Sequence, residues 1–240
     1  MIIKPRKGKK ERLVTETVIM VFSPNDFEKT YKLIQNYNPI FCSLDNFKLF
    51  QIKPYYSPKN FCIAGPALGA PLAVLLLEKL IVLGAKNILT LGTCGSLQKE
   101  LIIGNFLIPT IGISEEGTSA HYPIKGKIPR SSSSINLKIQ NQLVKMGKEY
   151  IMGGVWTTDA PYRETVEKVL KYQKMGIGGV DMEMSALFTV ATFRKVELGG
   201  IFVVSDELSN LEWKPGFSSS QFKSAWRVAL EIILKTASSL

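Results

Sequence analysis

Residues 178–187 read GGVDMEMSAL, and this stretch sets two carboxylates, Asp181 and Glu183, among glycines and apolar side chains typical of a protein interior. The apolar residues that follow recur at the spacing i, i+3, i+4 and i+7, which predicts one face of a buried helix: Met184, Leu187, Phe188 and Ala191. Glu183 then belongs to the first turn of that helix. Since a buried carboxylate must be paired, hydrogen-bonded or put to use, the stretch predicts a functional site as well as a helix.

On either side of this stretch, apolar strands alternate with helices. Residues 199–208 (GGIFVVSDEL) predict a buried strand that places Ser205 and Asp206 at its carboxyl end. Further strands are expected at 14–22, 86–92, 104–113 and 150–158, and further helices at 26–37, 70–84 and 220–240. This alternation indicates an α/β fold, in which ligands gather at the carboxyl ends of the strands.

Two segments show no clear periodicity. The chain after residue 37 is irregular and rich in aromatic residues through Tyr56, and the four serines Ser131–Ser134 predict a surface loop. Neither an internal repeat nor a linker interrupts the rest. We therefore expect a basic tail over residues 1–12, followed by a single domain over 13–240.

The charge and hydropathy of the chain limit its possible partners. Half of the net charge of +10 comes from the tail, and the rest lacks the aromatic and basic alternation of a strand-binding surface, so nucleic-acid binding is not expected. The longest apolar run, residues 71–84, is interrupted by Glu78 and Lys79 and is too short to span a bilayer. With no signal-peptide pattern at the start, we expect a cytoplasmic protein that has no membrane partner.

The residues that usually bind metals or form disulfides are few. The three cysteines, Cys42, Cys62 and Cys94, are far apart, which disfavours disulfides and thiolate metal sites. A single histidine, His121, excludes a histidine-rich metal centre and disfavours a Ser/His/Asp hydrolase. Neither a P-loop nor a GxGxxG motif occurs. No metal and no nucleotide cofactor are therefore expected.

Three of the predicted strands end in small or polar residues: LTLGTCGSL (89–97), VWTTDAPYRET (155–165) and VVSDEL (203–208). In the first, backbone N–H groups and the hydroxyls of Thr93 and Ser96 could hold a phosphate or a sugar oxygen. A tight turn that merely uses the freedom of glycine explains the same residues equally well.

Taken in order, the segments GTCGSL, EGTSAHY, WTTDAPYRE, DMEMSAL and VVSDEL resemble the nucleoside phosphorylase superfamily, in particular its uridine phosphorylase and bacterial purine nucleoside phosphorylase branches. The resemblance runs from about Phe61 to the end. It implies a single-domain, three-layer α/β fold whose central mixed and partly barrel-like sheet is flanked by helices. It also implies a homo-oligomer, built from dimers into a trimer or hexamer.

The resemblance assigns roles to individual residues. Glu183 would hold the ribose hydroxyls as a charged carboxylate, with Met182 against the sugar, while Asp181 supports the turn. Asp206 would act as the general acid that protonates a purine-like base, and Tyr162 would lie near that base. Gly92 and Thr93 would contact phosphate. The uridine branch has Asn-Arg in place of Ser-Asp, which favours a purine, whereas EGTSAHY and WTTDAPYRE are closer to uridine phosphorylases, so the base stays open.

The sequence departs from the family pattern at the residues that are expected to contact phosphate. The expected Gly-Asp-Pro loop with its arginine reads FSPNDFEKT here, and Thr90 stands where a second arginine is usual. A cation would have to come from Arg163, the basic tail or a neighbouring subunit. Phosphorolysis to a free base and ribose 1-phosphate, with phosphate as co-substrate, is the preferred interpretation. Hydrolysis with water activated by Asp26 or Glu28 is the close alternative, and a family member that binds a nucleoside without cleaving it is the third.

Overall fold

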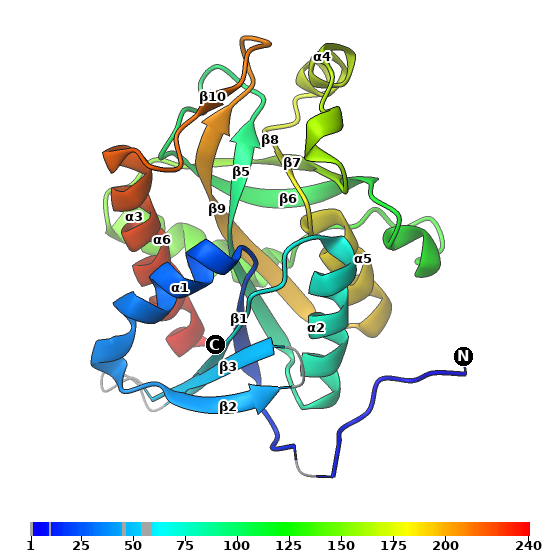
Figure 1. Ribbon diagram of the computed structural model, residues 1–240, viewed down its shortest axis with the longest axis vertical. Helices are drawn as coiled ribbons and strands as arrows, with labels where there is room; N and C mark the ends of the chain where they lie inside the picture. The colour runs from blue at the N-terminus through cyan, green and yellow to red at the C-terminus, as the bar shows by residue number, and fades with distance from the viewer. Residues whose placement is uncertain (1, 10, 45–46, 54–58) are drawn as a thin grey trace.

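A mixed ten-stranded sheet runs through the computed structural model, which describes residues 2–9, 11–44, 47–53 and 59–240 (Figure 1). In spatial order the strands are β10-β9-β6-β7-β8-β5-β1-β4-β3-β2. Their bounds are β1 Thr17–Val21, β2 Ile40–Leu44, β3 Phe47–Ile52, β4 Phe61–Gly65, β5 Asn87–Ser96, β6 Phe106–Glu115, β7 Ile151–Thr158, β8 Gly179–Asp181, β9 Glu197–Glu207 and β10 Lys214–Pro215.

Part of this sheet closes on itself. β5 pairs in parallel with β9 and antiparallel with β8, and β6 and β7 complete a ring of five strands. Outside the ring, β1 pairs in parallel with both β5 and β4, and the antiparallel hairpin of β2 and β3 extends the open edge. β5 therefore belongs to the ring and to the open sheet alike, and the prediction of a mixed, partly barrel-like sheet is confirmed.

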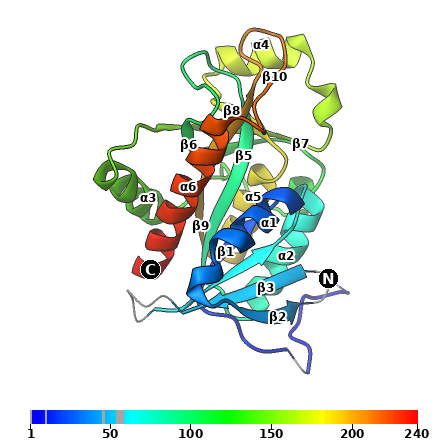
Figure 2. The same cartoon turned by 60° about the vertical axis from the view of Figure 1, so that its left-hand side comes forward.

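Helices cover both faces of the sheet (Figures 1 and 2). The helices α2 and α5 pack on one side through a core that includes Leu76, Leu80 and Phe188, and α3 and α6 pack on the other through Ile139, Trp226 and Ile233. This arrangement confirms the three-layer prediction. The bounds are α1 Pro24–Leu33, α2 Ala70–Val82, α3 Ser133–Lys145, α4 Val166–Lys174, α5 Met184–Arg194 and α6 Ser220–Ser239, with short 3₁₀ turns at Gln35–Tyr37, Ser119–His121 and Pro161–Arg163.

The predicted helix after Glu183 is α5, and it is buried more completely than its spacing indicates. Every residue from Met184 to Ala191 is buried, including Ser185 and Thr189. The hydroxyl of Thr189 donates to the carbonyl of Ser185, and the hydroxyl of Ser185 donates to Glu116 Oε1 at 2.9 Å, so both polar groups are satisfied inside the core.

Two predictions of irregular structure are wrong. The aromatic stretch contains β2 and β3, whereas its end, including Tyr56, lies outside the described residues. Of the four serines, Ser131 is buried, Ser132 precedes α3, and the other two form the first turn of that helix. The serines at the start of α3 have no apolar spacing that would indicate a helix. The apolar residues of its buried face come later: Ile135, Ile139 and Leu143.

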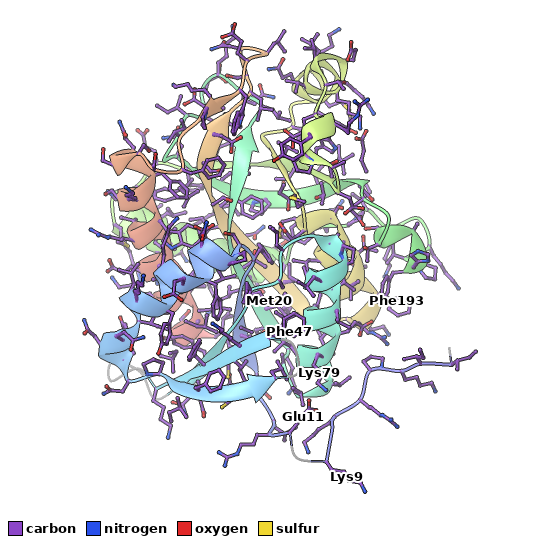
Figure 3. The ribbon with its side chains drawn as sticks, viewed as in Figure 1. Lys9, Glu11, Met20, Phe47, Lys79 and Phe193 are labelled. Atoms are coloured by element: carbon purple, nitrogen blue, oxygen red, sulfur yellow. The ribbon has the colours of Figure 1, made fainter. Side chains whose placement is uncertain are left out.

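The basic tail runs beside α2, and Ile3 and Pro5 share a hollow with Pro71, Val74 and Glu78 of that helix. Its Glu11 carboxylate lies 2.6 Å from the Lys79 ammonium group, and Figure 3 shows these two residues close together at the lower end of α2. Ile2 and Ile3 are exposed. None of the helices in the described part of the chain combines the length and hydropathy needed to cross a membrane.

Candidate active site

A cavity of about 650 Å³ opens at the carboxyl ends of β5, β8 and β9. Its wall also includes the start of α1, the segment after β7 and the segment after β9. All six residues that the sequence assigns to the site line this one cavity: Gly92, Thr93, Tyr162, Met182, Glu183 and Asp206. The fold thus brings together residues from four separate parts of the sequence, while the role of each stays a prediction.

Glu183 is buried at the floor of the cavity, directly before α5. Its Oε1 accepts a hydrogen bond of 2.6 Å from the backbone N–H of Gly69. Gly69 has φ +85°, a left-handed conformation that glycine adopts without strain and that side chains rarely adopt. Desolvation, and then the charge of Asp181, raises the pKa of Glu183. This carboxyl group therefore keeps its proton to higher pH than an ordinary glutamate, whereas a charged carboxylate is expected here from the sequence.

Asp181, at the end of β8, caps the start of α5. Its Oδ2 accepts hydrogen bonds from the backbone N–H groups of Glu183 at 3.0 Å and Met184 at 2.6 Å, and its Oδ1 accepts one from the hydroxyl of Thr157. The side chain thus supports the turn, as expected. Asp181 has three donors, one of them a side-chain hydroxyl, whereas Glu183 has backbone N–H donors alone, so Asp181 is the member of the pair better able to stay ionised.

Asp206, near the end of β9, is held by two donors. The hydroxyl of Ser205 donates to its Oδ1 at 2.7 Å and the indole N–H of Trp213 donates to its Oδ2 at 2.9 Å. Desolvation nevertheless raises its pKa above the ordinary range of an aspartate. A carboxyl group in this position keeps its proton to higher pH, which suits a general acid.

The start of α1 supplies the residues nearest in sequence to the missing phosphate loop. Ser23, Asn25, Asp26 and Lys29 all line the cavity. The ammonium group of Lys29 lies 2.9 Å from Asp26 Oδ1, and Lys29 is the one basic side chain among the described residues of the cavity wall. Lys29 was not predicted as a site residue. Its side chain reaches the cavity because of how α1 packs on the sheet, and the periodicity of the sequence does not indicate that packing.

Three other residues considered from the sequence lie away from this cavity. Arg163 and Glu28 are exposed and are absent from its wall. Thr90 is fully buried on β5, where its hydroxyl faces Met184 Sδ at 3.6 Å. A Cβ atom on the neighbouring Gly200 would lie only 1.8 Å from Thr90 Oγ1. The position of the expected arginine is therefore packed on every side by the sheet and α5.

One further carboxyl group and two aromatic rings complete the cavity wall. Glu164 lies in the segment between β7 and α4, and Trp213 and Phe217 lie in the segment after β9. Tyr162, Trp213 and Phe217 are exposed by 100%, 65% and 48%, so the mouth of the cavity presents open aromatic surfaces. Glu164, Trp213 and Phe217 were not predicted from the sequence, since isolated loop residues carry no periodic signal.

His121 and the cysteines take no evident part in this cavity, apart from Cys94, which is buried in its wall. Burial raises the pKa of the Cys94 thiol well above its usual value, which disfavours the nucleophilic thiolate form. His121 lies in a second hollow, with Tyr122, Arg194 and the tail residues Ile3 and Pro5. No group of three or more metal-ligating side chains assembles within the described ranges.

Curated proteins and solved structures resemble this chain over nearly its whole length. The family described as the phosphorylase superfamily matches residues 16–237. The DeoD-type purine nucleoside phosphorylase of Caldanaerobacter subterraneus subsp. tengcongensis is 28% identical over 230 residues, which cover 94% of this chain and 97% of that protein. A DeoD-type purine nucleoside phosphorylase of Bacillus cereus is 26% identical over 76% of this chain and 77% of its own length.

Two solved structures share the fold. Purine nucleoside phosphorylase from Toxoplasma gondii, in complex with immucillin-H, superposes with a TM-score of 0.84 at 21% identity, covering 94% of this chain and 91% of that one. Uridine phosphorylase from Vibrio fischeri superposes with a TM-score of 0.83 at 22% identity, covering 95% and 93%. Purine and pyrimidine enzymes thus match the fold equally well. From its sequence match and its fold together, the chain belongs to the phosphorylase superfamily, with purine nucleoside and uridine phosphorylases as its relatives.

Proposed function

We propose that this chain is a pentosyltransferase that cleaves the N-glycosidic bond of a ribonucleoside with phosphate, releasing a free base and ribose 1-phosphate. The observation that carries the proposal is the position of Lys29 in the same cavity as Gly92, Thr93, Glu183 and Asp206. A cation stands in the cavity wall although both expected arginines are missing. No cofactor is needed for this reaction, since phosphate is the co-substrate.

Each residue has a part in the proposed reaction. Glu183 accepts hydrogen bonds from the ribose hydroxyls, and Met182 packs against the sugar. As the glycosidic bond breaks, positive charge develops on the sugar and negative charge on the leaving base, and Asp206 protonates that base. Tyr162 covers the base at the mouth of the cavity. These assignments rest on the resemblance to the family together with the shared cavity.

Phosphate would bind between Lys29 and the turn at Gly92 and Thr93. Apart from Lys29, the charged residues in the cavity wall are carboxyl groups: Asp26, Glu164, Asp181, Glu183 and Asp206. An anion is repelled by ionised carboxylates, so the raised pKa of Asp206, which keeps its proton to higher pH, favours phosphate binding by reducing that charge. A homo-oligomer, as in the family, would allow a neighbouring subunit to add a further cation.

Hydrolysis is the second candidate, and Asp26 is the observation that favours it. Asp26 is buried in the cavity wall, whereas Glu28 lies outside it, so Asp26 is the carboxylate available to activate water. Its ion pair with Lys29 would have to open before Asp26 could accept a proton from water. A chain that binds a nucleoside without turnover is the third candidate.

The presence or absence of phosphate separates these candidates. Purified protein is incubated with adenosine, inosine, guanosine or uridine in phosphate-free buffer and at increasing phosphate, and base and sugar products are quantified by chromatography. Phosphorolysis predicts saturable dependence on phosphate and ribose 1-phosphate as product. Equal rates without phosphate, with free ribose as product, would establish a nucleosidase. Binding without any base release would establish the third candidate.

A further inference from the structure

Glu164 is a carboxyl group in the cavity wall that the proposed chemistry does not use. It follows the 3₁₀ turn Pro161–Arg163, and its backbone N–H donates to the carbonyl of Pro161, which fixes the turn. The side chain is half-buried and lines the cavity together with Tyr162, Asp206 and Trp213. Among the described residues, none donates a hydrogen bond to its carboxyl group.

This lack of a donor distinguishes Glu164 from its neighbour Asp206, whose two oxygens are already engaged by Ser205 and Trp213. A half-buried carboxylate without a donor is unfavourable, and a bound molecule that carries N–H groups would supply what the protein does not. Desolvation, followed by the charge of Asp206, raises the pKa of Glu164 to about 7. The carboxyl group is thus ionised mainly above neutral pH.

The composition of the cavity wall indicates which base would satisfy this group. Within the described chain, the amide and basic side chains of the wall are Asn25 and Lys29, and both come from the start of α1. The remainder, where Tyr162, Glu164, Asp206 and Trp213 lie, offers carboxyl groups and aromatic rings. Uracil and hypoxanthine each present a ring N–H beside carbonyl oxygens that require donors, whereas a 6-aminopurine presents amino N–H groups and no carbonyl oxygen.

We infer that Glu164 is a specificity-determining residue of this site, whose carboxylate accepts a hydrogen bond from the amino group of the leaving base and so selects 6-aminopurine nucleosides. The inference rests on the proposed function in that it takes the cavity to be the nucleoside site. It holds whether phosphate or water attacks the sugar, because both reactions release the same base.

The test compares adenosine with inosine, which differ in the 6-substituent and the protonation of N1, in wild-type protein and in Glu164→Gln. We expect wild-type protein to favour adenosine in kcat/KM, and the variant to lower the adenosine-to-inosine ratio by about tenfold or more, since a charge-assisted acceptor is replaced by an amide that can donate to the inosine carbonyl. Glu167→Gln is the matched control, because Glu167 is exposed and lies outside the cavity wall.

The pH dependence of the adenosine-to-inosine ratio gives a second measurement. A purely structural role of Glu164 would leave this pH dependence unchanged. The other charged groups of the wall are Asp26, Lys29, Asp181, Glu183 and Asp206, and their ionisation acts on both nucleosides and largely cancels in the ratio. The ratio should therefore rise with pH through about 7 in wild-type protein and stay flat in Glu164→Gln. An unchanged ratio in the variant, or a wild-type preference for inosine or uridine, would overturn the inference.

Failure of the proposed function is separable from failure of this inference. Should no nucleoside be cleaved, calorimetric titration with adenine and hypoxanthine measures base recognition directly. Tighter binding of adenine that is lost in Glu164→Gln would uphold the inference without turnover. Equal affinity for both bases, or no binding of either, would overturn it.

Discussion

At the scale of single residues, the two carboxylates before α5 divide their tasks by hydrogen bonding. Asp181 accepts from three donors and holds the turn, whereas Glu183 accepts from backbone N–H groups alone and lines the cavity. Under the proposed function, ribose hydroxyl donors would offset the cost of burial that raises the pKa of Glu183.

Glu183→Gln should reduce kcat/KM for the preferred nucleoside by about 10- to 150-fold, because a hydrogen bond to a charged group contributes about 1.5–3 kcal/mol. Steady-state kinetics over the accepted nucleosides measures the change. Unaltered kcat/KM on all of them would remove Glu183 from the site.

Thermal unfolding serves as the control for this variant. The folded state of wild-type protein retains the Glu183 proton to higher pH than the unfolded chain does, so its stability falls as pH rises above the ordinary glutamate pKa of 4.5. Glutamine has no proton to lose. The variant should therefore be at least as stable as wild type at pH 8. If it unfolds at a lower temperature than wild type, its loss of activity is attributed to a destabilised fold.

Asp206→Asn should lower kcat by about 10²–10⁴-fold on a purine nucleoside, the usual contribution of a general acid, with little change in the unfolding temperature. Trp213→Phe is the companion variant: it keeps the ring and removes the N–H that donates to Asp206. Since that donor favours the ionised form, its removal should shift the alkaline limb of the pH–rate profile to higher pH. An inactive Asp206→Asn protein that is also unfolded would make Asp206 a structural residue.

At the scale of elements, the strands and helices with strong apolar patterns were predictable from the sequence, and the edges of the fold were not. β5, β9, α2, α5 and α6 have long buried runs or regular spacing. α3 begins with serines that resemble a loop, and the β2–β3 hairpin lies at the open edge of the sheet, where alternation is weaker. The site divides in the same way: the strand-end residues were predicted, while Lys29, Glu164 and Trp213 depend on how α1 and two loops pack.

The orientation of α1 makes a prediction about phosphate. Lys29→Gln should raise the KM for phosphate by about tenfold or more and leave the KM for nucleoside nearly unchanged, because a cation is lost from the phosphate end alone. Lys32→Gln is the control on the same helix, since Lys32 is exposed, pairs with Glu28 at 3.7 Å and lies outside the cavity wall. A phosphate KM that stays the same in Lys29→Gln would place the phosphate cation elsewhere.

At the scale of the whole molecule, the tail and the barrel differ in how firmly they are tied to the fold. The ring of five strands is closed by backbone pairing on every side, whereas Ile2 and Ile3 are exposed and Glu11 joins the tail to α2 through Lys79. The positive charge gathered in residues 1–12 is therefore attached to the fold and is not part of its core.

Removal of residues 1–12 should leave the fold and the kinetic constants intact and remove half of the net positive charge. Loss of the Glu11–Lys79 pair should lower the unfolding temperature by about 2–4 °C, the change that about 1 kcal/mol produces in a chain of this size. Circular dichroism and calorimetry measure both. An aggregated or unfolded truncated protein would show that the domain begins before residue 13.

The contact between Thr90 and Gly200 has a consequence for how this protein can change over time. A guanidinium at position 90 needs space that Met184 fills, and a side chain at position 200 needs space that Thr90 fills, so each of these residues makes the other difficult to replace. An arginine at position 90 would require coordinated substitutions on β5, β9 and α5. A cation for an anion in the cavity is therefore easier to add on α1, where Lys29 already lines the wall, than on β5.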